Sequence, residues 1–559
     1  MRHQSKWLIF TSIIIVFSLI LSACNTGSGP KGTSSSNSNS KLSDKQELKM
    51  VSTGDISTLS TFHATDGVSL RALEEVQSGL MRLDVNGKVI PDMAADMPKV
   101  SNDQTVYTFK IRPDAKWSNG DPVTADDFVY AWRTMVEKDT ASEYAFILGS
   151  AAIKNAQAIM DPKSPLFNKV DKLGVKAIDQ KTLQVTLVRP TPFFLSLLSF
   201  PAFFPVDKKV VDKFGDAYGT EIDKMVYNGP FILTEWNHGV GWSFKKNPDY
   251  WDKKNIHLTK VTYKVIKDET TATKLYDTNK IDYTTISQDL IGLYDNKPDL
   301  HKGVLGKGSI FLRLNEKTSA LKNENIRDAI YNAIDRKQLT DLLLKDGSAP
   351  AYYFVAKENM YGPDGKDFRA KYPEINKHPL NWAKDKWNQG LKEIGTKKIE
   401  LGLLITEGSP NDDIAQFIKG QLEKNLKGLT IKINKQPNNS FFKLETSGDY
   451  DISLASWGPD YPDPMSDLDM WVTGGPFNET GFSSKQYDSM IEQAKNLGSD
   501  PTKRFEVMQE AEKLLLEKSV IVPLYQPAYV YLMKPYVKNF VYKRPGPNED
   551  WTYVYIKKH

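Results

Sequence analysis

Cysteine is almost absent from this chain: Cys24 is the only one among 559 residues. A single cysteine has no partner for a disulfide within the chain. Histidine is scarce as well, and none of the seven is spaced i, i+4 from another or stands in an H-E-x-x-H pattern. The local sequence therefore gives no support for a zinc site, and we expect no metal and no cofactor.

The motifs of several enzyme classes are missing too. There is no G-x-S-x-G elbow and no P-loop, and residues 306–308 form a lone G-x-G that is more typical of a turn than of a phosphate site. Aspartate pairs are plentiful, but sequence alone does not bring two carboxylates to face each other as a hydrolase requires. These absences favour a binding protein, with an extracellular hydrolase as the minor alternative.

Strong charge and a second apolar run are also lacking. The net charge of +4 is small for this length, and no dense block of Lys and Arg with interleaved aromatic residues occurs. Nucleic acid is therefore not an expected partner. Beyond the N-terminus no apolar run approaches the length of about 20 residues that a membrane-spanning helix needs.

The N-terminus indicates export. Arg2 and Lys6 precede an apolar run at 7–20, which is too short for an ordinary membrane span and fits the core of a secretory signal. The next residues, LSAC, end in Cys24 and resemble the lipobox of bacterial lipoproteins, which are cleaved before the cysteine and lipidated on its thiol. We expect a signal peptide at 1–23 and acyl chains, palmitate among them, on Cys24. An ordinary signal peptide with an incidental cysteine is the alternative.

The segment after the cysteine predicts a tether. Residues 25–40 are rich in Ser, Gly and Asn and have almost no apolar side chains, so they cannot bury enough surface to offset the cost of ordering. We expect 24–44 to be a flexible linker. Two acyl chains hold a soluble domain stably on a bilayer. The expected location is the extracytoplasmic face of the cell membrane, on a Gram-positive cell surface.

The remaining chain predicts a mixed α/β protein of two or three domains, because about 515 residues exceed one hydrophobic core. Residues 106–112 alternate as a half-buried strand, and Thr124 with Asp127 forms an N-capping arrangement before a helix. Asp500 and Pro501 likewise indicate the start of a helix. Helical and strand-like periods are interleaved throughout, which is typical of α/β folds.

One short stretch combines a strand with a proline-rich turn. Residues 449–457 alternate with Tyr450, Ile452 and Leu454 on one face, and Trp457 lies at the end of the opposite face. The prolines that follow stop the strand. Trp457 and Asp460 therefore lie at the exit of a strand, where α/β folds tend to bind ligands.

The acidic residues of this stretch have three interpretations. A calcium loop needs oxygen ligands at alternate positions and a glycine at its sharp turn, and the prolines break that spacing. A solvated acidic loop and a site for a cationic ligand both stay open on the residues alone. We assign Asp463, Asp467 and Asp469 to the solvated surface.

Eight stretches in order resemble the peptide-binding lipoproteins of ATP-binding-cassette (ABC) importers, the oligopeptide-binding family, also called solute-binding protein family 5. The most specific is YTFKIRPDAKWSNGDPVTADDFVYAWRT at 107–134. The resemblance covers nearly all of the mature chain, and the other stretches are 139–149, 173–194, 228–236, 261–283, 327–339, 447–464 and 521–535.

The resemblance implies a periplasmic-binding-protein-like α/β fold: two ligand-clasping lobes joined by two hinge strands, and a third, smaller inserted lobe. The expected first lobe is discontinuous, the inserted lobe is 80–207, and the second ligand lobe is 307–528. The pieces of the first lobe are 45–79, 208–306 and 529–559.

The resemblance also implies a binding site. The family's ammonium-binding aspartate matches Asp460, and a buried acceptor suits a compact cation. The backbone of Ser456, Trp457 and Gly458 would pair with an extended peptide, and main-chain pairing binds peptides with little regard to their sequence. The segment 63–68 would pair with the peptide as a second strand through Asp66 and Val68, and Tyr144 would contact the peptide near its amino end. A turn-capping role for Asp66 and a core role for Tyr144 are the alternatives.

Two positions depart from the family pattern. Leu454 stands where some relatives use an arginine for the ligand carboxylate, and a pocket tryptophan of the family falls near Asn438. The expected function is nevertheless capture of short peptides by a monomer and their delivery to an ABC permease. The alternatives are a pheromone receptor, or the same fold bound to a sugar, a metal complex or haem.

Overall fold

Six strands form the largest sheet, in the order β14–β18–β13–β17–β15–β16. This is a computed structural model, and it describes residues 41–559 except 85–86, 287, 409, 476 and 543–548. β15 runs parallel to β16 and β17, whereas β13 is antiparallel to β17 and β18. The strands are β13 (Ser309–Leu314), β14 (Ala349–Pro350), β15 (Ile399–Thr406), β16 (Leu429–Gln436), β17 (Ile452–Trp457) and β18 (Ile521–Gln526).

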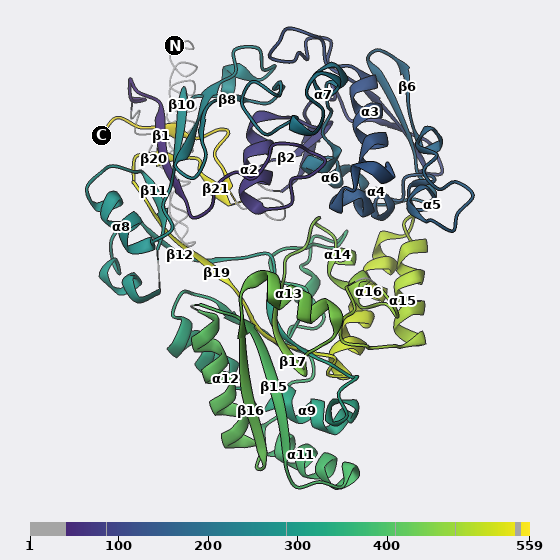
Figure 1. Cartoon of the computed structure of the whole chain (residues 1–559), viewed down its shortest axis with the longest axis vertical. Coiled ribbons are helices and arrows are strands. Elements are labelled where there is room, and N and C mark those ends of the chain that lie inside the picture. The colour runs from purple at the N-terminus through teal and green to yellow at the C-terminus, as the bar shows by residue number, and fades with distance from the viewer. Residues whose placement is uncertain (1–40, 85–86, 287, 409, 476, 543–548) are drawn as a thin grey trace, which may run out of the picture. The chain divides into compact units, whose positions relative to one another are not determined.

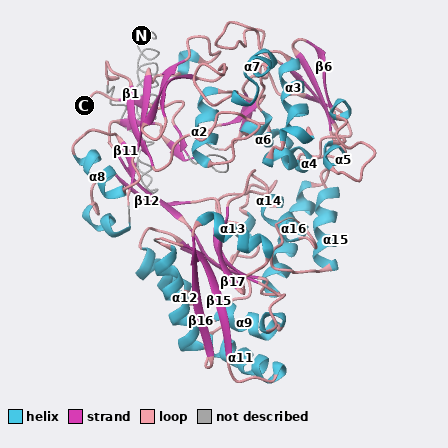
Figure 2. Cartoon of the chain, in the orientation of Figure 1, coloured by secondary structure: helices cyan, strands magenta, loops and turns pink. Residues whose placement is uncertain are grey.

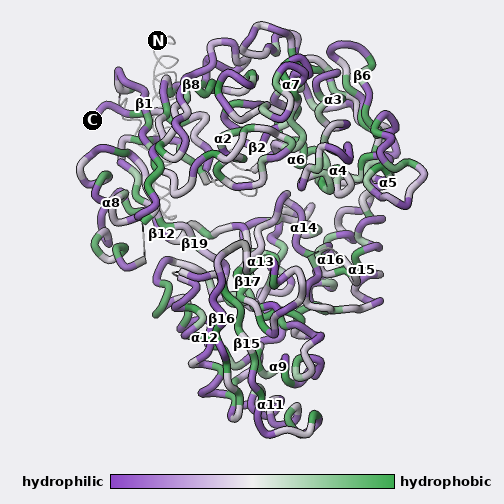
Figure 3. Tube along the Cα trace, in the orientation of Figure 1, coloured by the Kyte–Doolittle hydropathy of each residue, from purple (hydrophilic) through white to green (hydrophobic). Residues whose placement is uncertain are grey.

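Helices accompany the six-stranded sheet, with α9, α11 and α12 beside its strands in Figure 1. β15 is hydrophobic along most of its length in Figure 3, as expected of a strand in the middle of a core. The helices of this region are α9 (Glu324–Asn332), α10 (Arg336–Gln338), α11 (Leu380–Ile394), α12 (Asn411–Asn425), α13 (Asn438–Ser447), α14 (Met465–Leu468), α15 (Lys485–Asn496) and α16 (Pro501–Glu517).

Two further sheets each combine segments that lie far apart in the chain. One has four strands in the order β1–β10–β9–β8, and the other has three, in the order β11–β19–β12. Their strands are β1 (Glu47–Ser52), β8 (Phe231–Asn237), β9 (Gly241–Lys246), β10 (Lys260–Val265), β11 (Tyr283–Thr285), β12 (Leu300–Leu305) and β19 (Ala528–Met533). Nearby elements are α2 (Gly67–Val76), α8 (Glu269–Asp277), β20 (Val537–Lys538), β21 (Val541–Tyr542), β22 (Glu549–Asp550) and β23 (Tyr555–Ile556).

A separate four-stranded sheet, in the order β4–β5–β7–β6, is built entirely from residues 99–186. Its strands are β4 (Lys99–Val100), β5 (Val106–Lys110), β6 (Val175–Asp179) and β7 (Thr182–Thr186). The segment 81–214, which includes this sheet, also contains the pair β2 (Met81–Leu83) and β3 (Val89–Pro91), and the helices α3 (Ala125–Met135), α4 (Phe146–Ser150), α5 (Ala156–Met160), α6 (Phe194–Leu197) and α7 (Lys208–Phe214). Helices and strands are interleaved along the whole described chain (Figure 2), which confirms the predicted α/β class.

Three local predictions are confirmed. Tyr107 and Phe109 are buried on one face of β5. Thr124 and Asp127 form the reciprocal capping box at the start of α3. The Asp500 side chain accepts the Lys503 amide at the start of α16. These caps satisfy amide groups that have no partner inside the helix.

The chain passes twice between the three-stranded and the six-stranded sheet. β12 leads to β13 through residues 306–308, and β18 leads to β19 through Pro527. The two crossings lie side by side, because the Gly306 amide donates to the Pro527 carbonyl at 2.6 Å and the Gln526 side chain donates to the Gly306 carbonyl at 2.8 Å.

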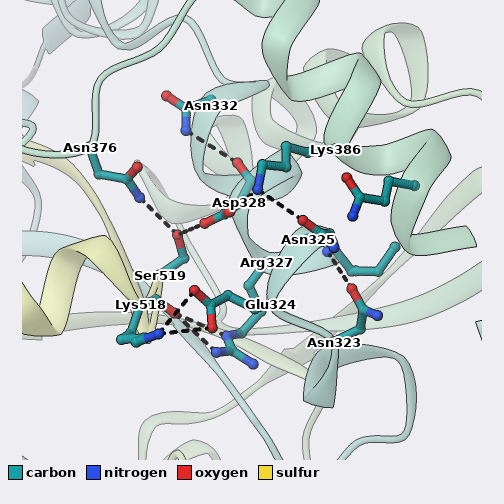
Figure 4. Close-up of polar contacts among 12 residues, drawn as sticks. Asn323, Glu324, Asn325, Arg327, Asp328, Asn332, Asn376, Lys386, Lys518 and Ser519 are labelled. Carbon is teal, nitrogen blue, oxygen red and sulfur yellow. Dashed lines mark hydrogen bonds and ion pairs between the residues drawn. The ribbon is translucent and has the colours of Figure 1, made fainter. Parts of the chain in front are cut away.

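Polar contacts fasten α9 to the turn that follows α16 (Figure 4). Arg327 is buried and donates to the Lys518 carbonyl at 3.0 Å. The carboxylate of Asp328 accepts the Ser519 hydroxyl at 2.8 Å, and Ser519 in turn accepts the Asn376 amide at 2.9 Å. The turn lies directly before β18, so these contacts hold one strand of the central sheet in place.

The last residues of the predicted tether 24–44 are folded. Leu42 forms an isolated β-bridge with Lys557, and the Ser43 amide donates to the Ile556 carbonyl at 2.9 Å. Residues 42–44 therefore belong to the folded unit 42–559. The predicted signal peptide 1–23 and Cys24 lie outside the described residues.

Candidate functional site

Strand β17 has one edge that is only partly paired. On one side it pairs with β13 over its whole length, from Ile452 to Trp457. On the other side β15 pairs only with Ile452 and Ser453, since β15 then continues beside β16 alone. Within the described part of the chain no strand covers this edge at residues 454–457. Such an edge presents peptide groups to which a further extended segment can hydrogen-bond.

The proline-rich turn after β17 folds back onto α14. The indole N–H of Trp457 donates to the Ser466 carbonyl at 3.2 Å, and the Asp460 amide donates to the Ser466 hydroxyl at 2.9 Å. β17 ends at Trp457, as the prolines predict. Ser456 and Gly458 are exposed, so their backbone is accessible at the point where the open edge ends.

Asp460 is half-buried at the end of this edge. Burial raises the pKa of its carboxyl to about 6, while the positive charge of Lys307 acts in the opposite direction. Lys307 lies in the crossing between β12 and β13. A Cβ on Gly308 would lie 2.0 Å from the Trp457 carbonyl oxygen, so only glycine allows this crossing to pass so close to the end of β17. A partly desolvated carboxylate is costly when charged and gains much from a cationic ligand.

Tyr144 comes from a distant part of the sequence and lies near Asp460. Burial raises the pKa of the Tyr144 hydroxyl, and the negative charge of Asp460 raises it further, so this hydroxyl stays protonated at physiological pH. Its ring packs edge-on against Phe200, with centroids 5.0 Å apart. Tyr144 thus lies near Asp460 and has the aromatic packing of the alternative core role, and its implied peptide contact stays a prediction.

A cavity of about 350 Å³ adjoins Asp460. One wall comes from residues 146–160 and 189–193, and the other from residues 457–477 with Lys495 and Arg504. A second, smaller cavity of about 50 Å³ lies against Asp460 and Pro462 and is bordered by α2. Ligand sites commonly span about 300–1,000 Å³, so the larger cavity has the size of a small site.

Aromatic rings close the larger cavity. Phe193 stacks on Tyr461 with centroids 4.5 Å apart and planes 16° from parallel. The guanidinium of Arg504 lies 5.4 Å from the Phe193 ring, and Trp457 packs against Phe477 at 5.5 Å. Stacked rings and a cation over a ring add to area burial. These contacts join residues 189–193 to the turn that carries Asp460.

Asp66 caps a helix in this structure. Its carboxylate accepts the amides of Val68 and Ser69 at 3.0 and 2.9 Å, and α2 begins at Gly67. The turn-capping alternative is therefore present. Val68 is a helical residue whose amide is already bonded, so the segment 63–68 is not an extended strand beside the site. The implied peptide contacts of Asp66 and Val68 stay predictions.

The expectation that Asp463, Asp467 and Asp469 are solvated is wrong. Asp463 is 7% exposed and is ion-paired with Arg504, and Asp467 is 2% exposed. Burial raises the pKa of the Asp467 carboxyl well above its ordinary value, and the positive charge of Arg369 acts in the opposite direction. Asp469 is half-buried and pairs with Lys495 at 2.6 Å. The turn folds these residues inward, and Arg504 of α16 and Lys495 of α15 pair with Asp463 and Asp469.

The structure places the two residues that depart from the family pattern in different elements. Leu454 is buried in the core of the six-stranded sheet, so this position offers no cation to a ligand. Asn438 is the first residue of α13. Sequence reasoning missed Phe193, Tyr461 and Arg189 at the cavity, although the run RPTPFF that contains two of them was part of a matched stretch.

The described residues contain no cluster of three or more His, Cys, Asp or Glu side chains suited to a metal ion. In the same part of the chain, no helix combines the length and apolar character that a membrane span requires.

An α/β protein whose largest sheet contains a strand with a partly open edge, beside a half-buried carboxylate, has the build of a receptor for a small extended solute. The chain belongs to the bacterial extracellular solute-binding proteins, family 5, whose middle region ("Bacterial extracellular solute-binding proteins, family 5 Middle") matches residues 88–479. The predicted family is confirmed.

Relatives of known name match over almost the full chain. The dipeptide-binding protein of Lactococcus lactis subsp. cremoris is 32% identical over 99% of this chain and 100% of its own length. The dipeptide-binding protein DppE of Bacillus subtilis is 33% identical over 97% of each chain. The oligopeptide-binding protein OppA of the same species is 29% identical over 93% of this chain and 94% of its own length.

Solved structures match equally well. The substrate-binding domain of an oligopeptide ABC transporter from Bacillus anthracis superimposes with a TM-score of 0.80 at 41% identity, covering 93% of this chain and 100% of that one. Listeria monocytogenes OppA bound to peptide gives 0.79 at 36% identity, covering 92% and 100%. The predicted periplasmic-binding-protein-like α/β fold is confirmed.

Proposed function

We propose that this protein binds short peptides outside the cytoplasm and delivers them to an ABC transporter for uptake. The observation that carries the proposal is the open edge of β17, which ends beside the half-buried carboxylate of Asp460. The edge supplies main-chain hydrogen bonds to an extended peptide through Ser456, Trp457 and Gly458, and Asp460 binds its ammonium group. The names of the relatives, which describe dipeptide and oligopeptide binding, support the same ligand class.

The two ligand lobes close around the bound peptide. The first lobe comprises 45–79, 208–306 and 529–559, the inserted lobe 80–207, and the second ligand lobe 307–528. The membership of the sheets supports this division, because every strand of the six-stranded sheet falls within 307–528 and every strand of the β4–β7 sheet within 80–207. The paired crossings at 306–308 and Pro527 are the hinges, a common arrangement for closure around a ligand.

A lipid on Cys24 anchors the protein to the extracytoplasmic face of the cell membrane, where a monomer meets its permease. The LSAC sequence after an apolar run supports this anchor. Metabolic labelling with a radioactive fatty acid tests it: the wild-type protein incorporates label, and Cys24→Ser does not.

Reception of a peptide pheromone is a second candidate. The pheromone receptor PrgZ superimposes on this chain with a TM-score of 0.79 at 34% identity, covering 92% of this chain and 100% of that one. Mass spectrometry of the peptides that copurify distinguishes the two uses: a pheromone receptor retains one sequence, and a nutrient receptor retains many.

Calorimetry of the full-length protein in detergent tests peptide binding. We expect heat on addition of di- to octapeptides, and a loss of about 3–5 kcal/mol of binding free energy for Asp460→Asn, because the ammonium then lacks its counter-ion. Asp449→Asn is the matched control, since Asp449 is exposed and precedes β17. Silence with all peptides overturns the proposal, and equal binding of N-acetylated peptides removes Asp460 from its role.

A further inference from the structure

The larger cavity beside Asp460 contains more charge than the proposed ammonium site uses. Its walls carry Arg189, Asp460, Asp469, Lys495 and Arg504. Most of these charges are paired within the protein: Lys495 with Asp469 at 2.6 Å, and Arg504 with Asp463 of the turn at 2.7 Å. Charges neutralised in this way have little left to offer a ligand.

Arg189 is the exception among the cations of the cavity wall. In the described part of the chain no carboxylate lies within ion-pair distance of its guanidinium, and the Arg189 carbonyl accepts the Thr191 hydroxyl at 3.3 Å. Its side chain is half-buried at the cavity. The cavity therefore presents one carboxylate, Asp460, and one guanidinium without an internal carboxylate partner.

The backbone holds Arg189 in place. Pro190 and Pro192 restrict the conformations of the segment that follows it. The segment also packs tightly on the loop between α15 and α16, since a Cβ on Gly498 would lie 2.0 Å from the Pro190 carbonyl oxygen. An arginine on such a segment loses less freedom on binding an anion than one on a mobile loop.

We infer that Arg189 binds a carboxylate of the peptide while Asp460 binds its ammonium group, so that the site selects short peptides carrying both charges. The inference rests on the proposed function and names its substrate class. A guanidinium suits this task because it donates two parallel hydrogen bonds to one carboxylate. The volume of about 350 Å³ lies at the small end of ligand sites, which favours short peptides.

Arg189 would supply the cation that is missing at Leu454, where some relatives use an arginine for the ligand carboxylate. That position carries no cation, and its side chain lies in the core. Arg189 lies in the proposed inserted lobe and Asp460 in the proposed second ligand lobe. One zwitterionic ligand then contacts both lobes through opposite charges, and its binding favours the state in which the lobes meet.

Calorimetry with matched ligands tests the inference on the full-length protein in detergent. The ligands are di-, tri- and tetraalanine, their C-terminal amides, and two forms of alanyl-glutamic acid. One form has both carboxyl groups free and the other is amidated only at its α-carboxyl, which separates an α-carboxylate from a side-chain carboxylate. Arg189→Gln should weaken the best free peptide about tenfold to one-hundredfold, and its amide by less than about twofold. If the glutamate side chain supplies the carboxylate instead, Arg189→Gln should also weaken the form of alanyl-glutamic acid that is amidated at its α-carboxyl.

Arg133→Gln is the control, because Arg133 belongs to α3 of the same proposed lobe and does not line the cavity. Urea unfolding of each variant shows whether the protein still folds, and Arg189→Lys should restore part of the affinity. Equal weakening of free and amidated peptides, or no weakening at all, overturns the inference. Wild-type binding that is lost in Asp460→Asn but not in Arg189→Gln leaves the proposed function intact, whereas no peptide binding by the wild type overturns the proposed function itself.

Discussion

The guanidinium of Arg504 donates two hydrogen bonds to the carboxylate of Asp463, at 2.7 and 2.8 Å, across 41 residues of sequence. Both side chains are almost fully buried. Asp463 also accepts the Met465 amide at 2.9 Å, at the start of α14. This ion pair holds the turn that carries Asp460 against α16, and so it fixes the position of the carboxylate proposed to bind the ligand.

Removing Arg504 should destabilise the protein strongly. Arg504→Met leaves Asp463 buried without a counter-ion, at a cost of about 3–5 kcal/mol in the free energy of unfolding, measured in urea. The double variant Arg504→Met with Asp463→Asn should recover part of that loss. Lys495→Met is the control, because its pair with Asp469 is more exposed and is worth about 1 kcal/mol or less. Equal losses in both single variants would contradict the prediction.

Asp460→Asn should stabilise the ligand-free protein at neutral pH. Its folded pKa of about 6 exceeds the ordinary 3.8, so the folded state binds the proton more tightly and wild-type stability falls as pH rises from about 4 to 6. The gain for asparagine should be absent at pH 4 and reach at most about 3 kcal/mol above pH 6. Thermal unfolding of both proteins across this range measures it, and a constant difference would contradict the burial of Asp460.

Peptide affinity should depend on pH with the same midpoint. An ammonium group binds the charged carboxylate, so affinity should be constant above about pH 6 and fall about tenfold per pH unit below it. Above about pH 8 the free peptide loses its own charge and affinity should fall again. Calorimetry from pH 4 to 9 tests this, with Asp460→Asn as a control whose weaker binding should show no acidic limb, because asparagine does not titrate in this range.

Gly498→Ala should weaken peptide binding. The Cβ of the alanine would lie 2.0 Å from the Pro190 carbonyl oxygen, so the contact between the loop at 498 and residues 189–193 must open. This overpacking should cost about 1–3 kcal/mol in the free energy of unfolding. Gly420→Ala is the matched control: no atom lies within 4 Å of its Cβ position in α12, and alanine should be neutral or slightly stabilising there. Calorimetry and urea unfolding of both variants separate affinity from stability. Unchanged affinity in Gly498→Ala would show that this contact is not needed for binding.

Much of the fold could be predicted because it depends on short-range patterns. The alternation of residues 106–112, the capping box at Thr124 and the cap at Asp500 all involve neighbours in sequence, and each appears in the structure. β17 was harder: Tyr450, Ile452 and Leu454 are buried as predicted, but Ser453 and Ala455 are buried too. Neighbouring strands and layers on both sides decide this, and no local pattern reports them.

The candidate site divides in the same way. Trp457 and Asp460 could be placed at the exit of a strand, because the prolines after them stop the strand wherever it packs. The surroundings could not be placed. The sequence around Asp463 is typical of a surface turn, but its counter-ion Arg504 comes from a helix that begins 38 residues later. Arg189 is typical of a loop in sequence, and only the folded chain places it at the same cavity as Asp460.

The sequence by itself determined the family, the α/β class and the position of the candidate carboxylate, since each rests on residue order and local spacing. The tertiary structure alone decided which edge of β17 is open, which acidic residues are buried, and which cations are already paired. The physical reason is that desolvation and ion pairing depend on distances between groups far apart in the chain, and folding sets those distances.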